Sequence, residues 1–147
     1  MDETKVFDKA KWHSDGDFPK GLSADQAFVH TGLFLGWIID SELYSEDFAT
    51  SLAAEIDQFK GRRLTGPGVY RSGDGVFMDE MLNPEGLEFT TEYFDFQTGK
   101  YLQDYEKLFA DGLPSMYHVQ DTWENYDRLK PQLDKQFASW RKNRGLG

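Results

Sequence analysis

The sequence contains no cysteine, and this absence excludes several classes of protein. Disulfide scaffolds, thiol catalysis, cysteine-ligated zinc and iron–sulfur clusters all require thiols. The chain has 147 residues. A chain of this length buries roughly 70% of its unfolded surface, so it needs neither a disulfide nor a metal to fold. Because a domain usually has about 150 residues, we expect a single domain over 1–147.

Basic side chains are scarce: 16 Lys and Arg stand against 26 Asp and Glu, which gives a net charge of −10. Nucleic acid is therefore not expected as a partner, because binding it depends on neutralising phosphates. Long apolar runs are also missing. The most apolar stretch, 27–39, is shorter than the ~20 residues of a membrane-spanning helix, so no membrane partner is expected. No signal peptide is recognisable at the N-terminus, which favours a cytoplasmic location.

Aromatic side chains are abundant, at 16% of the chain, and they recur at helical spacing. This content excludes an acidic disordered chain. The periodicity predicts a mainly α fold, a compact single-domain bundle of about five helices around an aromatic core. An irregular N-terminal segment over 1–22 should pack on this domain. A loop should cover 61–75, and a short helical turn around Val69–Ser72 is an alternative within it. The expected helices cover 23–40, 45–60, 83–96, 101–109 and 121–140.

Local signals refine two of these helices. Ser23 and Gln26 have the spacing of a capping box, in which each side chain binds the other residue's backbone amide. Asp121 and Glu124 have a similar spacing. Pro131 removes a backbone donor inside the last helix and should kink it or split it in two.

Two further features concern packing and an alternative fold. Gly32 and Gly36 lie four residues apart on one helix face and would let another backbone approach closely. Phe, Tyr and Thr within 87–103 also suit a hairpin around Thr98-Gly99, which would make the fold α+β. The sequence is also compatible with short strands near 4–8, 76–78 or 115–119.

Charge is segregated along the chain. Residues 72–127 carry thirteen acids and two bases, whereas 128–147 carry six bases and one acid. An acidic surface accelerates association with a basic partner. The first functional hypothesis is therefore a non-enzymatic interaction module that binds a basic protein, as immunity proteins bind toxins. The residues expected to form this acidic face are Asp79, Glu80, Glu85, Glu88 and Glu92.

The three histidines are the best candidates for chemistry. Histidine is a common metal ligand and general base. No pair has the short spacing of a helical metal motif, so the simplest interpretation is three separate histidines with structural hydrogen bonds. The second functional hypothesis is a small-ligand or metal-binding protein, or a small enzyme, in which the three histidines converge. The residues of this candidate site are His13, His30, His118, Asp15, Asp17 and Asp121.

No phosphate-binding loop, EF-hand or nucleophile elbow occurs, so no catalytic residue, resident metal or cofactor is assigned. Three stretches nevertheless resemble those of a known family. They are Trp12-His13 through Gly16-Asp17-Phe18-Pro19, His30 through Trp37 (HTGLFLGW), and Tyr117-His118-Val119 through Asp121-Thr122-Trp123. The whole chain resembles an uncharacterised family of small bacterial proteins, a domain of unknown function. The resemblance implies a bacterial, soluble, single-domain protein and no particular activity.

Overall fold

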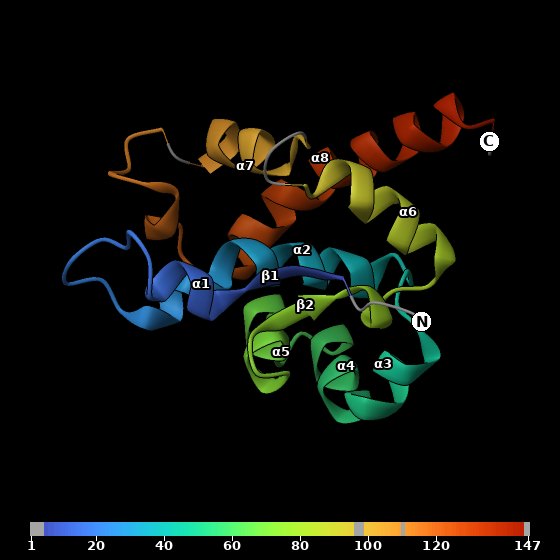
Figure 1. Ribbon diagram of the computed structural model, residues 1–147, viewed down its shortest axis with the longest axis horizontal. Coiled ribbons are helices and arrows are strands. Elements are labelled where there is room, and N and C mark those ends of the chain that lie inside the picture. The colour runs from blue at the N-terminus through green and yellow to red at the C-terminus, as the bar shows by residue number, and fades with distance from the viewer. Residues whose placement is uncertain (1–4, 96–98, 110, 146–147) are drawn as a thin grey trace.

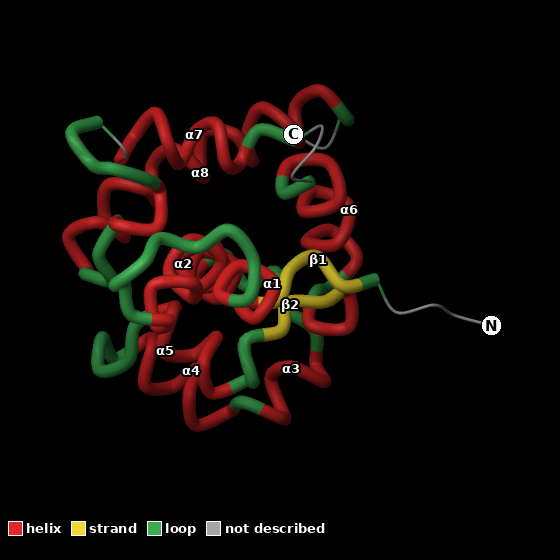
Figure 2. The backbone as a smooth tube through the Cα atoms, turned by 60° about the vertical axis from the view of Figure 1, so that its left-hand side comes forward, coloured by secondary structure: helices red, strands yellow, loops and turns green. Residues whose placement is uncertain are grey.

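The chain folds around one central helix, α2 (Val29–Asp40), as the computed structural model shows (Figure 1). The structure describes residues 5–95, 99–109 and 111–145. Every residue of α2 from Val29 to Ile39 is buried, since the helix is apolar on nearly all sides and must be covered all round. Figure 2 shows α2 nearly end-on, with α4 and α5 on one side and α7 and α8 on the other.

The described residues form eight α-helices, three short 3₁₀ helices and one two-stranded sheet. This confirms a mainly α fold with a few short strands, and there are more helices than the five or so expected. In chain order the elements are β1 (Val6–Lys9), α1 (Ala10–Ser14), η1 (Ala24–Phe28), α2 (Val29–Asp40), α3 (Glu46–Ser51), α4 (Ala53–Lys60), α5 (Gly66–Ser72), β2 (Val76–Met78), η2 (Asp79–Met81), α6 (Pro84–Tyr93), α7 (Tyr101–Phe109), η3 (Met116–His118) and α8 (Trp123–Asn143).

The sheet holds the N-terminal segment on the domain. Strands β1 and β2 pair antiparallel, with Val6 opposite Met78 and Asp8 opposite Phe77, so the register shifts at Phe7. Such an irregularity redirects side chains. As a result Phe7 and Asp8 are both buried although they are consecutive in a strand. Two of the short strands left open by the sequence are formed, β1 near 4–8 and β2 at 76–78, whereas residues 115–119 include η3 and no strand. Segment 1–22 was expected to be extended or irregular, and it also contains the helix α1.

Helices α2 and α5 cross at glycines. A Cβ atom added to Gly32 would lie 2.3 Å from the Pro67 Cα, and one added to Gly66 would lie 2.2 Å from the Gly32 carbonyl oxygen. At Gly36 an added Cβ would lie 2.9 Å from the Phe59 ring. Gly32 and Gly36 therefore permit the close backbone approach that their spacing predicts.

Two expected helices and one expected loop differ from the structure. The capping box at Ser23 is wrong: the Ser23 hydroxyl accepts from the Asp25 amide, and Gln26 donates to two distant carbonyls instead. The helix expected over 45–60 is interrupted at Leu52, whose φ of −121° is not helical. The loop expected over 61–75 contains more than the short turn near Val69–Ser72: helix α5 begins at Gly66, and its N-cap Thr65 accepts from the Gly68 amide.

The elements after residue 83 agree more closely with the helical spacing of the apolar residues. Helices α6 and α7 are formed as the helical interpretation of 87–103 requires, so the hairpin alternative is wrong. Phe96 and Thr98, which belonged to that argument, lie outside the described residues. Helix α8 is neither split nor capped by Asp121. It runs through Pro131, and its N-cap is Thr122, which accepts from the Asn125 amide.

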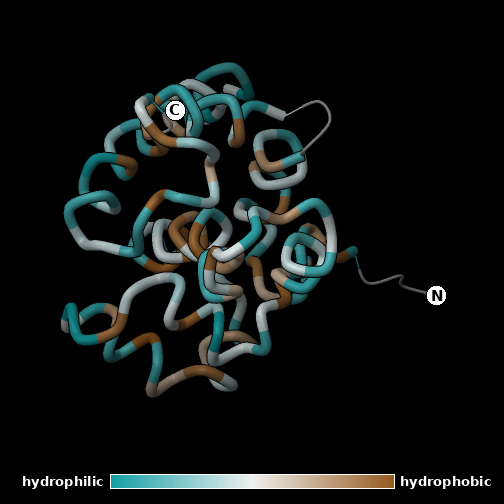
Figure 3. Tube along the Cα trace, turned by 90° about the vertical axis from the view of Figure 1, so that its left-hand side faces the viewer, coloured by the Kyte–Doolittle hydropathy of each residue, from teal (hydrophilic) through white to brown (hydrophobic). Residues whose placement is uncertain are grey.

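Aromatic rings fill the core, as expected. The Phe34 ring is fully buried, and its neighbours are the rings of Phe77, Phe94 and Tyr101, all within 6 Å between centroids. Hydropathy along the chain shows the same arrangement, with apolar residues concentrated where the helices meet (Figure 3). Within the described ranges, no helix has both the length and the apolar character needed to cross a bilayer.

Candidate functional site: a buried carboxylate between two histidines

Asp8, His13 and His30 bring their side chains together from three elements, β1, α1 and α2. The His13 Nε2 atom lies 2.7 Å from Asp8 Oδ1 and 3.3 Å from His30 Nε2. The His30 Nε2 atom lies 3.5 Å from Asp8 Oδ2. One potential ligand atom from each residue therefore falls within 4.8 Å of the others. We call these three residues the Asp8 cluster.

Burial determines the charge state of the Asp8 cluster. Asp8 is fully buried, His30 is 1% exposed, and His13 keeps 15% of its side chain exposed. Burial raises the pKa of the Asp8 carboxyl, but side-chain hydrogen bonds with His13 and His30 outweigh it and hold this pKa below its usual value. Burial lowers the pKa of His30 against the opposing effect of Asp8. The preferred state is thus an ionised carboxylate beside a neutral His30.

Neighbouring groups fix the orientation of the Asp8 cluster. The Thr31 hydroxyl, one residue after His30 on α2, donates to Asp8 Oδ2 over 2.5 Å. The Tyr117 hydroxyl from η3 lies 2.9 Å from His13 Nδ1. The Tyr101 hydroxyl donates to the main-chain oxygen of His30 over 2.5 Å. Thr31 and Tyr117 therefore hold the side chains of Asp8 and His13, as outer contacts usually hold metal ligands, and Tyr101 holds the backbone of His30.

The facing ring nitrogens have a chemical consequence. A neutral imidazole carries one proton, on either Nδ1 or Nε2. At 2.7 Å His13 Nε2 donates its proton to Asp8 Oδ1, and His13 Nδ1 then accepts from the Tyr117 hydroxyl; in the other tautomer the Nε2 lone pair faces Asp8 and His30. Lone pairs and a carboxylate that share one small space repel each other unless a proton or a cation lies among them. The arrangement can therefore hold either a shared proton or a metal ion.

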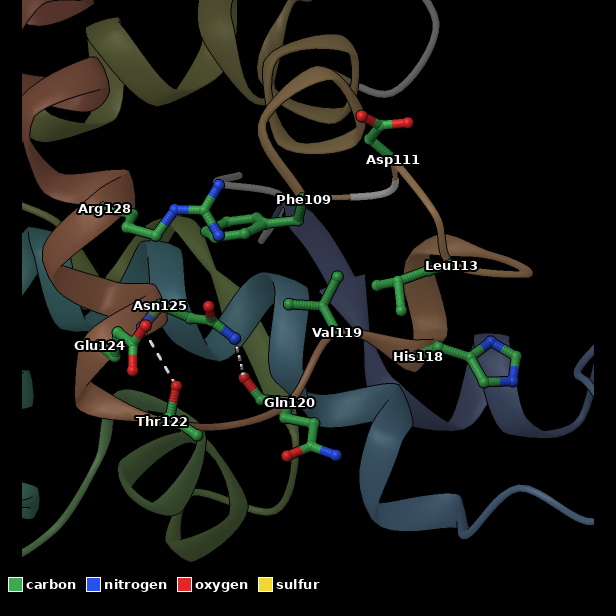
Figure 4. A pocket seen from close by; sticks show the side chains of 10 residues that line it. All are labelled: Phe109, Asp111, Leu113, His118, Val119, Gln120, Thr122, Glu124, Asn125 and Arg128. Carbon is green, nitrogen blue, oxygen red and sulfur yellow. Dashed lines mark hydrogen bonds between the residues drawn. The ribbon is translucent and has the colours of Figure 1, made fainter.

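The third histidine makes a separate contact. His118 Nδ1 lies 2.9 Å from the Ser115 hydroxyl oxygen, and His118 lines a pocket of about 400 Å³ between α7 and the start of α8. In Figure 4 its ring points away from Arg128, on the opposite side of that pocket. His118 is not in the group of ligand atoms that Asp8, His13 and His30 form.

The three aspartates proposed beside the histidines are also outside the Asp8 cluster. Asp15 is the exposed C-cap of α1, and Asp17 is exposed. Asp121 accepts a hydrogen bond from the Thr65 hydroxyl over 2.7 Å, and burial raises the pKa of its carboxyl. The structure thus places two of the six proposed residues, His13 and His30, in one cluster.

Most of the proposed acidic face meets basic groups of the same chain. Glu85 forms an ion pair with Arg141, and Glu92 forms one with Arg144. The Glu88 carboxylate lies 3.9 Å from the Arg144 guanidinium. Helix α8 therefore supplies counter-charges along α6. Of the two remaining members of the face, Asp79 accepts from the Lys5 amide over 3.0 Å, and Glu80 is exposed. Binding of a basic partner through this face stays a prediction.

Sequence reasoning missed Asp8 and Tyr117 as partners of His13. Asp8 carries no motif, and its burial depends on the irregular register of β1. One signal was available: Asp8 and His13 are five residues apart, and the strand–helix junction between them brings their side chains together. Tyr117 lies 104 residues from His13, and only the tertiary fold joins them.

These observations define a mainly helical domain that contains a buried cluster of two histidines and one carboxylate. Residues 6–119 match the model of a family described as a domain of unknown function, DUF7832, and the chain belongs to this family. The match includes all three residues of the Asp8 cluster together with Tyr117. No curated protein and no solved structure matches the chain.

Proposed function

We propose that this protein binds one divalent transition-metal ion through Asp8, His13 and His30, and that zinc is the ion the ligand set suits best. The observation that carries the proposal is the meeting of one carboxylate and two Nε2 atoms, all within 4.8 Å, in the interior of the fold. Two imidazoles and a carboxylate form a common zinc set, and they also suit ferrous iron and manganese.

The distances within the Asp8 cluster support this proposal. Two Zn–N bonds of about 2.0–2.1 Å that meet at a tetrahedral angle place their nitrogens about 3.3–3.4 Å apart. His13 Nε2 and His30 Nε2 lie 3.3 Å apart, and His30 Nε2 lies 3.5 Å from Asp8 Oδ2. The shorter distance from His13 Nε2 to Asp8 Oδ1, 2.7 Å, is that of a hydrogen bond in a metal-free cluster. A bound ion replaces this hydrogen bond, and both ligands need to move by only a fraction of an ångström.

The charge state of the cluster also supports metal binding. Metal ligands must be deprotonated, and the lowered pKa values of Asp8 and His30 favour a carboxylate and a neutral imidazole. Tyr117 at His13 Nδ1 and Thr31 at Asp8 Oδ2 are contacts of the kind that strengthen metal ligands. Three protein ligands leave a tetrahedral shell incomplete, so water or a small ligand supplies the fourth.

The same bonds would join separate parts of the chain. Asp8 and His13 belong to the N-terminal segment β1–α1, whereas His30 belongs to the central helix α2. An ion bound by all three would fasten this segment to the core and stabilise the native state by mass action. The competing interpretation is a metal-free hydrogen-bond network that keeps the buried Asp8 carboxylate paired.

Calorimetric titration of chelator-treated protein with zinc chloride separates these interpretations. We expect one site per chain for the wild type and for His118→Ala, together with a higher melting temperature in the presence of zinc. His13→Ala should lose the site, and it is suited to the test because His13 is partly exposed. Far-UV circular dichroism of each variant checks its fold. Manganese and ferrous iron, titrated separately, test the choice of ion.

Two results would contradict the proposal. One is the absence of binding of any of the three ions to the wild type at millimolar concentration. The other is an equal loss of affinity in His13→Ala and His118→Ala, which would indicate weak binding by surface histidines. Either result would leave the Asp8 cluster as a hydrogen-bond network.

A further inference from the structure

An apolar groove lies between α3, β2 and η2, and it shares no lining residue with the Asp8 cluster. Its volume is about 340 Å³. The apolar side chains that line it are Phe48, Leu52, Val76, Met78 and Met81. Four of these five are only partly buried and Phe48 is buried, so the groove has an accessible apolar floor. We call it the methionine groove. Methionine side chains are flexible and polarisable, which suits a surface that adapts to a partner.

Acidic residues surround this floor. The charged residues that line the groove are Asp47, Asp74 and Glu80, and all three are exposed. None of its described lining residues is Lys or Arg. Within the described part of the chain, no basic side chain forms an ion pair with Asp47 or Asp74. This differs from α6, where Arg141 and Arg144 pair with the glutamates.

The segments that build the groove hold it in shape. Asp47 and Phe48 lie in the first turn of α3, whose N-cap Ser45 also donates to the Glu80 carbonyl oxygen over 2.6 Å. Asp74 has a φ of +66°, a left-handed conformation that aspartate tolerates better than most residues. All lining residues fall within 6–119, the part of the chain that matches the family.

We propose that the methionine groove binds a basic amphipathic segment of a partner protein. Apolar side chains of that segment would pack in the groove against Met78 and Met81, and its Lys or Arg side chains would meet Asp47 and Asp74. An amphipathic helix that lays its apolar face in a groove is a common mode of peptide recognition. The acidic rim of the groove, formed by Asp47, Asp74 and Glu80, selects a basic segment, and it makes association faster and dependent on salt.

A basic partner is therefore expected to bind at the methionine groove and not along α6. On α6, an incoming cation must compete with Arg141 and Arg144, which already pair with Glu85 and Glu92. At the groove, an incoming cation can pair with Asp47 or Asp74 without displacing a basic side chain of the described part of the chain. The proposal does not depend on metal binding, because the groove shares no residue with the Asp8 cluster.

Methionine-methyl NMR of the full chain provides the test. The chain has four methionines, and Met116 in η3 does not line the groove, so its methyl group is an internal control. The probe is a synthetic 14-residue peptide of leucine and lysine with leucines at helical spacing. A peptide with glutamate in place of each lysine is the control. We expect the Met78 and Met81 methyl resonances to shift with the basic peptide alone.

Fluorescence anisotropy with the same labelled peptide tests the role of charge. The double variant Asp47→Asn/Asp74→Asn should weaken binding about tenfold, as expected for the loss of two surface charge pairs. Asp111→Asn/Asp127→Asn, which removes two exposed charges outside the groove, should bind as the wild type does. The affinity should also fall as sodium chloride is raised from 50 to 300 mM.

Several results would overturn the proposal. Equal shifts with both peptides would show that the acidic rim does not select the occupant. Shifts at Met116 with none at Met78 and Met81, or no shift at millimolar peptide, would place binding elsewhere or nowhere. Shifts that depend on protein concentration without peptide would show that a second copy of this chain occupies the groove instead.

Discussion

The Nε2 atoms of His13 and His30 face each other across 3.3 Å, although the two residues are 17 positions apart and lie on different helices. Asp8 lies against both rings and is fully buried. A buried carboxylate is stable only when it is paired. The two imidazoles supply this pairing in the metal-free state, and the same three groups are arranged to bind an ion.

The Tyr117 hydroxyl should strengthen metal binding through His13. Tyr117→Phe removes the contact at His13 Nδ1 and leaves the ligands in place, so zinc affinity should fall about tenfold, the lower end of the effect usually seen for such outer contacts. Competition with a chromophoric chelator measures this change. Tyr44→Phe is the matched control, because its hydroxyl contacts Lys60 and not the cluster. Equal affinity for wild type and Tyr117→Phe would show that Tyr117 does not orient His13.

The close crossing of α2 and α5 should make Gly32 intolerant of any side chain. Gly32→Ala places a Cβ against the Pro67 backbone, which cannot yield as a flexible side chain can. We expect the free energy of unfolding to fall by about 2 kcal/mol or more, within the usual range for overpacking. Urea unfolding followed by tryptophan fluorescence measures it.

Gly73→Ala is the control for that substitution. Its added Cβ would lie 3.5 Å from the Leu52 side chain, an ordinary contact, and the φ of Gly73 is −91°. We expect a change below about 1 kcal/mol, as for substitutions that create neither strain nor a cavity. If Gly32→Ala were tolerated as well as Gly73→Ala, the two helices would not cross as closely as described.

Asp121 should make the stability of the chain depend on pH with a defined sign. Burial raises the pKa of its carboxyl above the usual 3.8, so the folded state binds this proton more tightly than the unfolded state does. The stability associated with the protonated form is present below 3.8 and is lost as pH rises through the folded pKa. An asparagine at this position does not titrate, so Asp121→Asn avoids this loss of stability and keeps an acceptor for the Thr65 hydroxyl.

Urea unfolding of the wild type and Asp121→Asn between pH 4 and pH 7 checks the sign. The variant should gain stability relative to the wild type as pH rises, and the difference should be greatest at pH 7. Comparing the two proteins at each pH cancels the effects of Asp8 and His30. A difference that shrinks toward pH 7 would mean that the folded state favours the ionised carboxylate.

The sequence predicted the helical class from the spacing of aromatic and aliphatic residues, because that spacing is a local property. It could not predict the break at Leu52, which no glycine or proline marks. It also could not predict the contacts of Gln26, whose amide donates to carbonyls of residues 117 and 119. These features depend on contacts between distant segments.

The candidate site was predicted only in part for the same reason. His13 and His30 were predicted because histidine is a common metal ligand and general base, and both belong to the cluster. Asp8 did not, since one aspartate among 26 acidic residues carries no local signal. Likewise the pairing of Glu85 with Arg141 joins residues 56 positions apart and is not visible in the charge pattern.

Zinc K-edge X-ray absorption of the zinc-loaded chain tests the central claim most directly, since it reports the atoms bound to the ion. The proposed site predicts two imidazole ligands and oxygen ligands at about 2.0–2.1 Å. His13→Ala should remove one imidazole from the spectrum, and His118→Ala should leave it unchanged. A first shell of oxygen alone, or an imidazole count that falls in His118→Ala, would contradict metal binding by Asp8, His13 and His30.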